Sequence, residues 1–429
     1  MNYKETIDYI HSAYWTGTKT GLTRTRELLS LLGNPERELR FVHVAGTNGK
    51  GSFCAMLSSI LVCAGYRTGL YTSPYVNRFN ERIAVNGLPI PDEDLAELLT
   101  RIRPVVEGMK EKPSEFELIT CAAMEYYKEQ KCDIVVLEVG MGGEWDSTNV
   151  ITTPELSVIT AMAYDHMQYL GNTMAEIAAA KAGIIKPGGT TLIYGENREA
   201  EAVFKKVCEE KHNTLVYSHP ERIIEKDNTL QGYTFSYPGF DALHLPLLGP
   251  HQLHNAALVL RAVELLREKG WRIPEEAVQK GLKTVHWPAR MELLHTQPTV
   301  LVDGGHNPQG AQAAASALKN LFPGKKIRFL MGVMADKDVE TMVETLLPLG
   351  EMFYTVTPHN PRAMQAETLA QRLRDLGAKA KPEESLEKGI HAFLTEAGKE
   401  DILCAVGSLY LAGDVRRVVQ EYYAGKLNF

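Results

Sequence analysis

The ten residues HVAGTNGKGS, positions 43 to 52, have the composition of a loop that binds phosphate groups. They follow an apolar run, Phe41–Ala45, and precede a helix-like run at 53–64. Glycines allow successive backbone N–H groups to face a phosphate, and the N-terminus of the following helix adds positive potential. Lys50 would reach the β- and γ-phosphates of a nucleotide, and Ser52 would contact a phosphate or a metal ion. We therefore predict a nucleotide site made by Gly46, Thr47, Asn48, Gly49, Lys50, Gly51 and Ser52.

Three further apolar runs lead into polar residues, at Ser73, Glu138 and His166. In open α/β sheets, ligands bind beyond the carboxyl ends of the strands, so these residues should converge near Lys50. A hydroxyl, a carboxylate and an imidazole beside phosphate groups indicate Mg²⁺ binding, in which oxygen ligands dominate. Each residue alone also fits a structural role, as a strand terminus, a paired carboxylate or a histidine satisfied by its neighbours.

A capping box formed by Thr173 and Glu176 predicts the start of a helix that carries Lys181 and stops at Pro187. By its sequence context alone, Lys181 is an ordinary lysine of that helix.

Short apolar runs alternate with amphipathic segments along most of the chain, which is typical of parallel sheets with crossover helices. Residues 213–248 do not follow this parallel pattern. Their alternating residues and turn signals predict a small antiparallel excursion from the parallel sheet. The segment 287–298 has the composition of a hinge, so we expect domains at 1–296 and 297–429. The predicted fold is α/β, with a mostly parallel, phosphate-loop-containing N-terminal domain and a Rossmann-like C-terminal domain. The predicted strands lie at 41–45, 68–72, 134–138, 156–161, 300–303, 327–332, 352–356 and 402–406.

Composition excludes several classes of partner. Among 429 residues, 46 Lys and Arg stand against 53 Asp and Glu, and a net charge of −7 gives no general attraction to nucleic acid or to anionic membranes. The six cysteines form no C-x-x-C pair, and the N-terminus lacks the apolar region of a signal peptide. No apolar run reaches the roughly 18–20 residues that span a bilayer. We expect a cytoplasmic protein with reduced thiols.

With these motifs in order, the chain resembles the folylpolyglutamate synthase/dihydrofolate synthase family of the Mur ligase superfamily. The resemblance extends from about residue 3 to residue 423. The matching segments are HVAGTNGKGS (43–52), YTSP (71–74), RFNERI (78–83), FELIT (116–120), LEVGMGG (137–143), DSTNVI (146–151), KAGIIKPG (181–188), PARMELL (288–294), DGGHNP (303–308), GVMADKD (332–338) and GSLYLAGDVR (407–416).

The resemblance implies roles that the residues alone do not supply. It implies carbamylation of Lys181 by CO₂, which would turn a cation into a carboxylate-like metal ligand. The implied Mg²⁺ ligands, or groups that support them, are Ser52, Ser73, Glu138, His166 and Lys181. The implied ATP contacts beyond the loop are Asn255, Arg290, Asp303 and His306, with Lys50, Lys181, Arg290 and His306 catalytic. Phe116 and Asp146 would lie near a pterin.

Five positions depart from the family pattern. Tyr75 stands where His is common, Glu144-Trp145 replaces Arg-Leu, Ala180 stands where Glu is usual, and Ala289 stands where Gly is usual. None belongs to the predicted phosphate site, whereas Glu144-Trp145 lies near the implied pterin side.

The implied reaction is the ATP-dependent addition of L-glutamate to folate, and also to dihydropteroate in some members, through an acyl phosphate. The family suggests a monomer. One alternative is a Mur ligase acting on a UDP-linked substrate, although such ligases usually carry a nucleotide-sugar domain ahead of a loop that here begins at residue 46. The other is a nucleotide-switch protein, which would not need a second α/β domain with DGGHNP.

Overall fold

The computed structural model describes residues 1–12 and 21–426. The chain divides into two compact units. The N-terminal unit comprises Met1–Ile223, Tyr237–Leu243 and His254–Val285, and the C-terminal unit comprises Ile224–Ser236, His244–Leu253 and His286–Phe429. The domain limits 1–296 and 297–429 remain a prediction. Within the described ranges, every helix is too short or too polar to cross a membrane.

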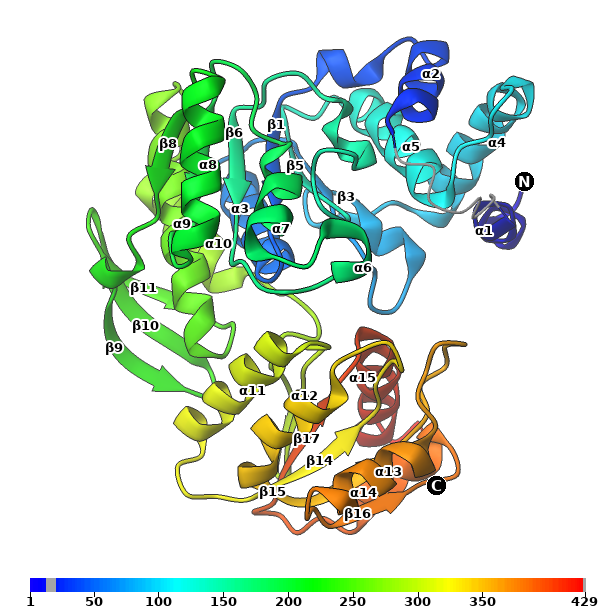
Figure 1. Cartoon of the computed structure of the whole chain (residues 1–429), viewed down its shortest axis with the longest axis vertical. Helices are drawn as coiled ribbons and strands as arrows, with labels where there is room; N and C mark the ends of the chain where they lie inside the picture. Colours follow the sequence, from blue (N-terminus) through cyan, green and yellow to red (C-terminus); the bar gives the residue numbers. More distant parts are fainter. Residues whose placement is uncertain (13–20, 427–429) are drawn as a thin grey trace. The chain divides into compact units, whose positions relative to one another are not determined.

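The N-terminal unit is built on an eight-stranded sheet with the order β4-β3-β2-β5-β1-β6-β7-β8 (Figure 1). The strands β2, β5, β1, β6, β7 and β8 are parallel to one another. β3 and β4 are added antiparallel at the edge next to β2. Every residue of β1 and β5 is buried, as expected for strands covered on both faces. The bounds are β1 (Phe41–Ala45), β2 (Thr68–Tyr71), β3 (Ile83–Val85), β4 (Leu88–Pro89), β5 (Ile134–Glu138), β6 (Leu156–Ile159), β7 (Thr190–Ile193) and β8 (Thr214–Tyr217).

Helices of the first part of the chain pack around this sheet (Figure 1). They are α1 (Tyr3–Ser12), α2 (Thr23–Leu31), α3 (Lys50–Cys63), α4 (Asp92–Gly108), α5 (Glu115–Glu129), α6 (Met167–Leu170), α7 (Met174–Ala182), α8 (Arg198–Glu210), α9 (Pro250–Glu268) and α10 (Glu275–Thr284). The capping box of Thr173 and Glu176 is present at the start of α7, as predicted.

The end of α7 differs from the prediction. The helix ends at Ala182, not at Pro187, and Gly183 follows it. A side chain at Gly183 would place its Cβ 2.3 Å from Glu144 Cα, so only glycine fits where the chain passes the 140–146 loop. Similarly, α3 begins at Lys50, earlier than the predicted residue 53.

The predicted antiparallel excursion is present as a separate three-stranded sheet, β9 (Ile224–Thr229), β10 (Gly232–Tyr237) and β11 (Phe240–Leu245). β9 and β10 pair antiparallel. Residues 214–217, which we expected to belong to the excursion, instead form β8 and pair parallel with β7.

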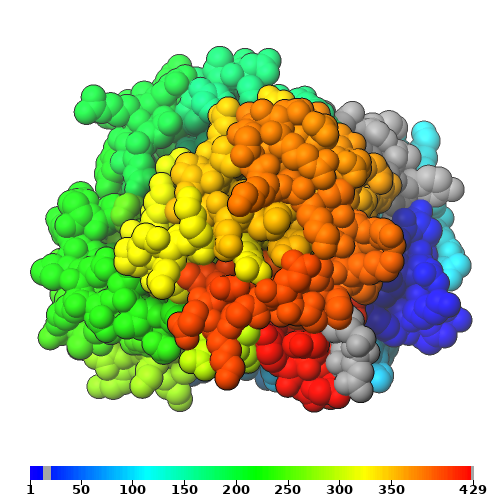
Figure 2. Space-filling model, turned by 90° about the horizontal axis from the view of Figure 1, so that it is seen from below, coloured from blue at the N-terminus to red at the C-terminus, as the bar shows by residue number. Residues whose placement is uncertain are grey.

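The C-terminal unit contains a six-stranded sheet with the order β12-β13-β17-β14-β15-β16, parallel except for β12. The strands are β12 (Glu292–Thr296), β13 (Thr299–Val302), β14 (Ile327–Met331), β15 (Gly350–Thr355), β16 (Ala380–Pro382) and β17 (Ile402–Val406). The helices are α11 (Pro308–Leu321), α12 (Val339–Leu346), α13 (Ala366–Asp375), α14 (Leu386–Thr395) and α15 (Leu409–Tyr423). The orange residues of α13 and α14 lie on the face of this unit shown in Figure 2. The predicted fold class is confirmed.

Gly281 allows α10 to approach α3 at the level of the backbone. A Cβ at this position would lie 2.5 Å from Ile60 Cα, and Ser59 Oγ donates a 2.8 Å hydrogen bond to Gly281 O. We expect Gly281→Ala to lower the free energy of unfolding by about 1–3 kcal/mol, because neither backbone can move away cheaply.

Urea unfolding followed by circular dichroism measures this effect. The control is Gly108→Ala at the end of α4, where no atom lies within 4 Å of an added Cβ. That change should be neutral, or stabilising by up to about 1 kcal/mol, through helix propensity. Equal stability of Gly281→Ala and the unmodified protein would contradict the packing argument.

Candidate active site

The loop between β1 and α3 is shaped by two glycines at positive φ, Gly46 (144°) and Gly49 (86°). A Cβ at Gly46 would lie 1.9 Å from Thr160 Oγ1, and a Cβ at Gly49 would lie 2.6 Å from Asn255 Oδ1. Both conformation and space therefore require glycine at these positions. The loop packs closely between the end of β6 and helix α9.

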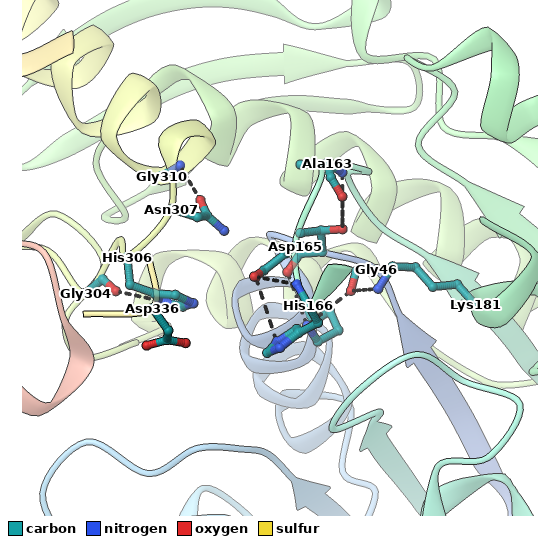
Figure 3. Close-up of polar contacts among 12 residues, drawn as sticks. Gly46, Ala163, Asp165, His166, Lys181, Gly304, His306, Asn307, Gly310 and Asp336 are labelled. Atoms are coloured by element: carbon teal, nitrogen blue, oxygen red, sulfur yellow. Dashed lines mark hydrogen bonds and ion pairs between the residues drawn. The ribbon is translucent and has the colours of Figure 1, made fainter. Parts of the chain in front are cut away.

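Hydrogen bonds fix the loop to the segment after β6. Thr47 N donates to Ala161 O at 2.9 Å, and Thr160 Oγ1 donates to Asn48 O at 2.8 Å. Ala163 N donates to Thr47 Oγ1 at 3.1 Å (Figure 3). Gly49, the N-cap of α3, offers no side chain to accept the first N–H groups of that helix. This end of α3 thus has the donors and the positive potential that bind an anion.

Two lysines share one acceptor at the base of the loop. Lys50 Nζ donates to Gly46 O and to Thr47 O, each at 3.2 Å, and Lys181 Nζ donates to Gly46 O at 2.8 Å (Figure 3). Lys181 is only 4% exposed. Burial, with a smaller contribution from the Lys50 charge, lowers the pKa of Lys181 to about 7. A large share of Lys181 is therefore uncharged near neutral pH.

The predicted strand-end residues occupy the same unit as the loop. Glu138, at the end of β5, is buried and accepts a 3.1 Å hydrogen bond from Ser73 N, just beyond β2. His166 has a left-handed backbone with φ 52° and is the N-cap residue that precedes α6. His166 N donates to Asp165 Oδ1 at 2.9 Å, and its Nε2 lies 3.8 Å from Asp165 Oδ2 (Figure 3). The structure thus joins Glu138 with Ser73, and His166 with Asp165.

The oxygen atoms near the carboxyl ends of these strands fit a hard cation. Ser52 is 2% exposed and Glu138 is 4% exposed, and both offer oxygen atoms. In the described part of the chain, no three His, Cys, Asp or Glu side chains form a ready metal cluster. Mg²⁺ is usually held by one or two carboxylates together with water and phosphate oxygens, so a sparse set of protein oxygens is what a nucleotide-bound Mg²⁺ requires.

A second group of residues lies around Gly140. Asp146 is buried and accepts hydrogen bonds from Met141 N (2.9 Å), Thr148 N (3.0 Å) and Thr148 Oγ1 (2.6 Å). Burial raises the pKa of Asp146, and these hydrogen bonds oppose that shift. A Cβ at Gly140 would lie 2.5 Å from Phe116 Cζ and 3.1 Å from Asp146 Oδ2. An aromatic ring and a carboxylate are thereby placed together, and their position near a pterin remains a prediction.

Two contributors to this group were not predicted, His43 and Thr148. His43 Nε2 lies 2.8 Å from Thr148 Oγ1, and burial lowers the pKa of His43 to about 3. Since the Thr148 hydroxyl donates to Asp146, it accepts from the N–H of a neutral His43. A histidine inside the otherwise apolar strand β1 was the available signal.

In the C-terminal unit, Arg290, Asp303 and His306 occupy one turn region. Asp303 follows β13 and accepts from Met291 N at 2.8 Å and from Gly305 N at 2.7 Å. A Cβ at Gly304 would lie 2.9 Å from Arg290 Nη1, so the guanidinium lies against this glycine. His306 Nδ1 is 3.2 Å from Gly304 O (Figure 3).

Comparison with known proteins shows the family of this chain. The Mur ligase middle domain matches residues 44–263, and the Mur ligase glutamate ligase domain matches residues 289–409. A dihydrofolate synthase/folylpolyglutamate synthase of Bacillus subtilis is 36% identical over 97% of this chain and 98% of its own. The chain belongs to the folylpolyglutamate synthase/dihydrofolate synthase family.

Two solved structures of this family match nearly the whole chain. One is a folylpolyglutamate synthase complex with AMPPCP and folate, with 33% identity, a TM-score of 0.86, and coverage of 98% of this chain and 100% of that chain. The other is the Escherichia coli FolC protein in complex with DHPP and ADP, with 28% identity, a TM-score of 0.88, and 99% coverage of both chains. This synthase is an ATP-dependent ligase of glutamate, which sets aside the nucleotide-switch alternative.

The buried amine of Lys181 makes the stability of this synthase depend on pH. Its folded-state pKa of about 7 lies below the ordinary value of 10.5, so the folded protein binds fewer protons than the unfolded chain between these values. Stability should therefore rise with pH from about 7 to about 10.5. In CO₂-free buffer we expect Lys181→Met to be more stable at pH 7, by on the order of a few kcal/mol, and to lose that advantage as pH rises.

Urea unfolding of both proteins at several pH values measures the difference. Lys206→Met, which removes an exposed lysine of α8, is the control and should show no such pH dependence. A difference between Lys181→Met and the unmodified protein that stays constant from pH 7 to pH 10 would contradict the burial of a neutral amine.

Proposed function

We propose that this ligase adds L-glutamate to folates and also adds the first glutamate to dihydropteroate. The observation that carries the proposal is the pairing of a phosphate-binding loop with the Phe116–Asp146 group in the same unit. A pterin is a flat ring with an N–H-rich edge. The ring fits the face of Phe116, and that edge fits a carboxylate oxygen such as Asp146 Oδ2, which also accepts from Met141 N. The 36%-identical relative carries both activities in its name.

The chemistry follows from the low reactivity of a carboxylate toward an amine. A carboxylate is a poor electrophile, so phosphoryl transfer from ATP to it gives an acyl phosphate with a good leaving group. We assign Lys50 and the N-terminus of α3 to neutralising the transferred phosphoryl group. The amine of glutamate then attacks the acyl carbon, the carbon–oxygen bond to phosphate breaks, and phosphate and a proton leave.

Mg²⁺, when bound, would neutralise phosphate charge, and we assign Ser52, Ser73, Glu138 and His166 to holding it or its water. We propose that Lys181 is carbamylated and completes this set. Its uncharged amine near neutral pH is the form that reacts with CO₂, and the resulting carbamate would replace an unfavourable buried cation beside Lys50 with an anion. Burial of Lys181 and the proximity of Lys50 support this assignment.

The remaining residues are assigned to reactant binding. Asn255 borders the loop at Gly49 and would contact ATP. Arg290 would bind the phosphates or the acyl phosphate, and Asp303 and His306 would support nucleotide binding or assist proton removal from the amine. We further propose a monomer in the cytoplasm, a setting in which the six free cysteines stay reduced.

Phosphate release from ATP and Mg²⁺ tests the function directly. We expect release with L-glutamate plus dihydropteroate, and also with L-glutamate plus tetrahydrofolate, and background release when glutamate or the pterin is omitted. Lys50→Ala should lower kcat by about 100–1,000-fold or more, because the transferred phosphoryl group loses the lysine assigned to neutralising its charge. Its circular dichroism spectrum should be unchanged.

The control for Lys50→Ala is Lys206→Ala, which should keep full activity. Release with tetrahydrofolate but not with dihydropteroate would limit the enzyme to folate extension. Pterin-independent release, or an active Lys50→Ala enzyme, would overturn the assignment.

Asp146→Asn separates pterin recognition from phosphate chemistry. An amide presents one acceptor where the carboxylate presents two, so we expect KM for the pterin to rise about 10–100-fold, the loss of one charged hydrogen bond. KM for ATP should not change.

Asp133→Asn is the matched control, since Asp133 accepts from Arg67 N before the start of β5, at the opposite edge of the sheet. Steady-state kinetics with each substrate varied in turn provides the measurement. An equal rise in KM for ATP and for the pterin would contradict a pterin-specific role of Asp146.

A further inference from the structure

Arg290 lies between two residues with an unfavourable backbone conformation. The residues on either side of it, Ala289 and Met291, both adopt left-handed conformations, with φ values of 56° and 46°. Both are buried, and neither is glycine. Non-glycine residues rarely adopt this conformation, and two in three positions persist only where surrounding contacts enforce them.

Two carboxylates supply those contacts, one on each side of Arg290. Glu292 Oε2 accepts from Ala289 N at 2.8 Å, and Asp303 Oδ2 accepts from Met291 N at 2.8 Å. Gly304 N also donates to Ala289 O at 2.8 Å. The 289–291 turn is therefore held at every point next to Arg290.

Glu292 is itself held by a cation from a distant part of the chain. Arg416, on α15, donates from Nε to Glu292 Oε2 at 2.6 Å and from Nη2 to Oε1 at 3.1 Å. The side chains are 9% and 12% exposed, so water competes little for either one. Such a two-pronged pair fixes the plane of the carboxylate as well as its position.

Other charged groups around Glu292 do not replace Arg416. His286 Nε2 lies 3.9 Å from Glu292 Oε1, beyond hydrogen-bond distance, and its side chain is 67% exposed. Arg290 directs Nη1 to Ala289 O at 3.0 Å and is not paired with Glu292 by any recorded contact. The orientation of Glu292 thus depends mainly on Arg416.

We propose that Arg416 is a positioning residue for the ligase reaction, acting through Glu292 to hold the left-handed 289–291 turn that presents Arg290. This inference rests on the proposed role of Arg290 in binding the phosphates or the acyl phosphate. Arg416 itself touches no reactant. Its loss lets the turn relax toward ordinary backbone conformations and moves the guanidinium of Arg290 away from its working position.

A double-mutant cycle tests the proposal. Arg416→Met should lower kcat by about 10–100-fold, the effect of misplacing a group by roughly an ångström, with KM for the pterin unchanged. In an Arg290→Ala background the same change should alter kcat by less than about twofold, because the group that it positions is gone. A general structural defect would lower kcat equally in both backgrounds.

Glycine at position 289 provides a rescue. Ala289→Gly removes the cost of the left-handed conformation, so it should restore part of the activity of Arg416→Met, by about threefold or more. The control is Arg328→Met, which removes an ion pair with Asp401 of 3.2 Å in the same unit and should leave kcat unchanged. If Arg416→Met does not fold, Arg416→Lys, which keeps the charge but not the two-pronged geometry, enters the same cycle.

The outcomes are distinguishable. Full activity of Arg290→Ala would overturn the proposed role of Arg290. A strongly impaired Arg290→Ala enzyme in which Arg416→Met causes a further loss of the same size as in the parent protein would leave that role intact and overturn the positioning role of Arg416.

Discussion

The structure of the phosphate site depends on a single carbonyl group, Gly46 O, which accepts hydrogen bonds from two lysines at once. Both amine groups lie at the base of a loop whose backbone already presents N–H groups. Burial is the main reason that the pKa of Lys181 is lowered, and the positive charge of Lys50 adds to the shift. In the proposed function, binding of a triphosphate at this loop would offset the positive charge of Lys50 and of the helix N-terminus.

The sheet order brings the required partners to this carbonyl. β1 lies between β5 and β6, and β2 follows β5, so the polar residues after these four strands share one edge. Glycine is what allows them to approach: Gly46 lies against Thr160, Gly49 against Asn255, and Gly140 against Phe116. The predicted nucleotide loop and the Phe116–Asp146 group therefore both lie at the carboxyl ends of the parallel strands. His43 of β1 links them through its hydrogen bond with Thr148.

The strands and the loop could be predicted because their signals are local. Apolar runs of four to six residues bounded by glycine or polar residues mark β1, β5 and β17 without any knowledge of their neighbours. The contact between His43 and Thr148 joins residues 105 positions apart, and no local pattern encodes it. Likewise, Lys181 has the context of a solvated helix residue, and only the packing of α7 against the loop buries it. The end of α7 was also misplaced, since the helix ends at Ala182 and not at Pro187.

The two units hold their anion-directed groups by opposite means. The N-terminal loop uses glycines, which adopt positive φ without steric cost but lose more conformational entropy on folding. The turn around Arg290 uses alanine and methionine, and pays with strain that Glu292 and Asp303 must overcome through hydrogen bonds to the backbone. The loop obtains its conformation from glycine, whereas the turn around Arg290 is held by hydrogen bonds to its backbone. In the proposed function, the second arrangement would hold the guanidinium in a fixed geometry for the acyl phosphate, because any freedom left in the turn would be lost again at each turnover.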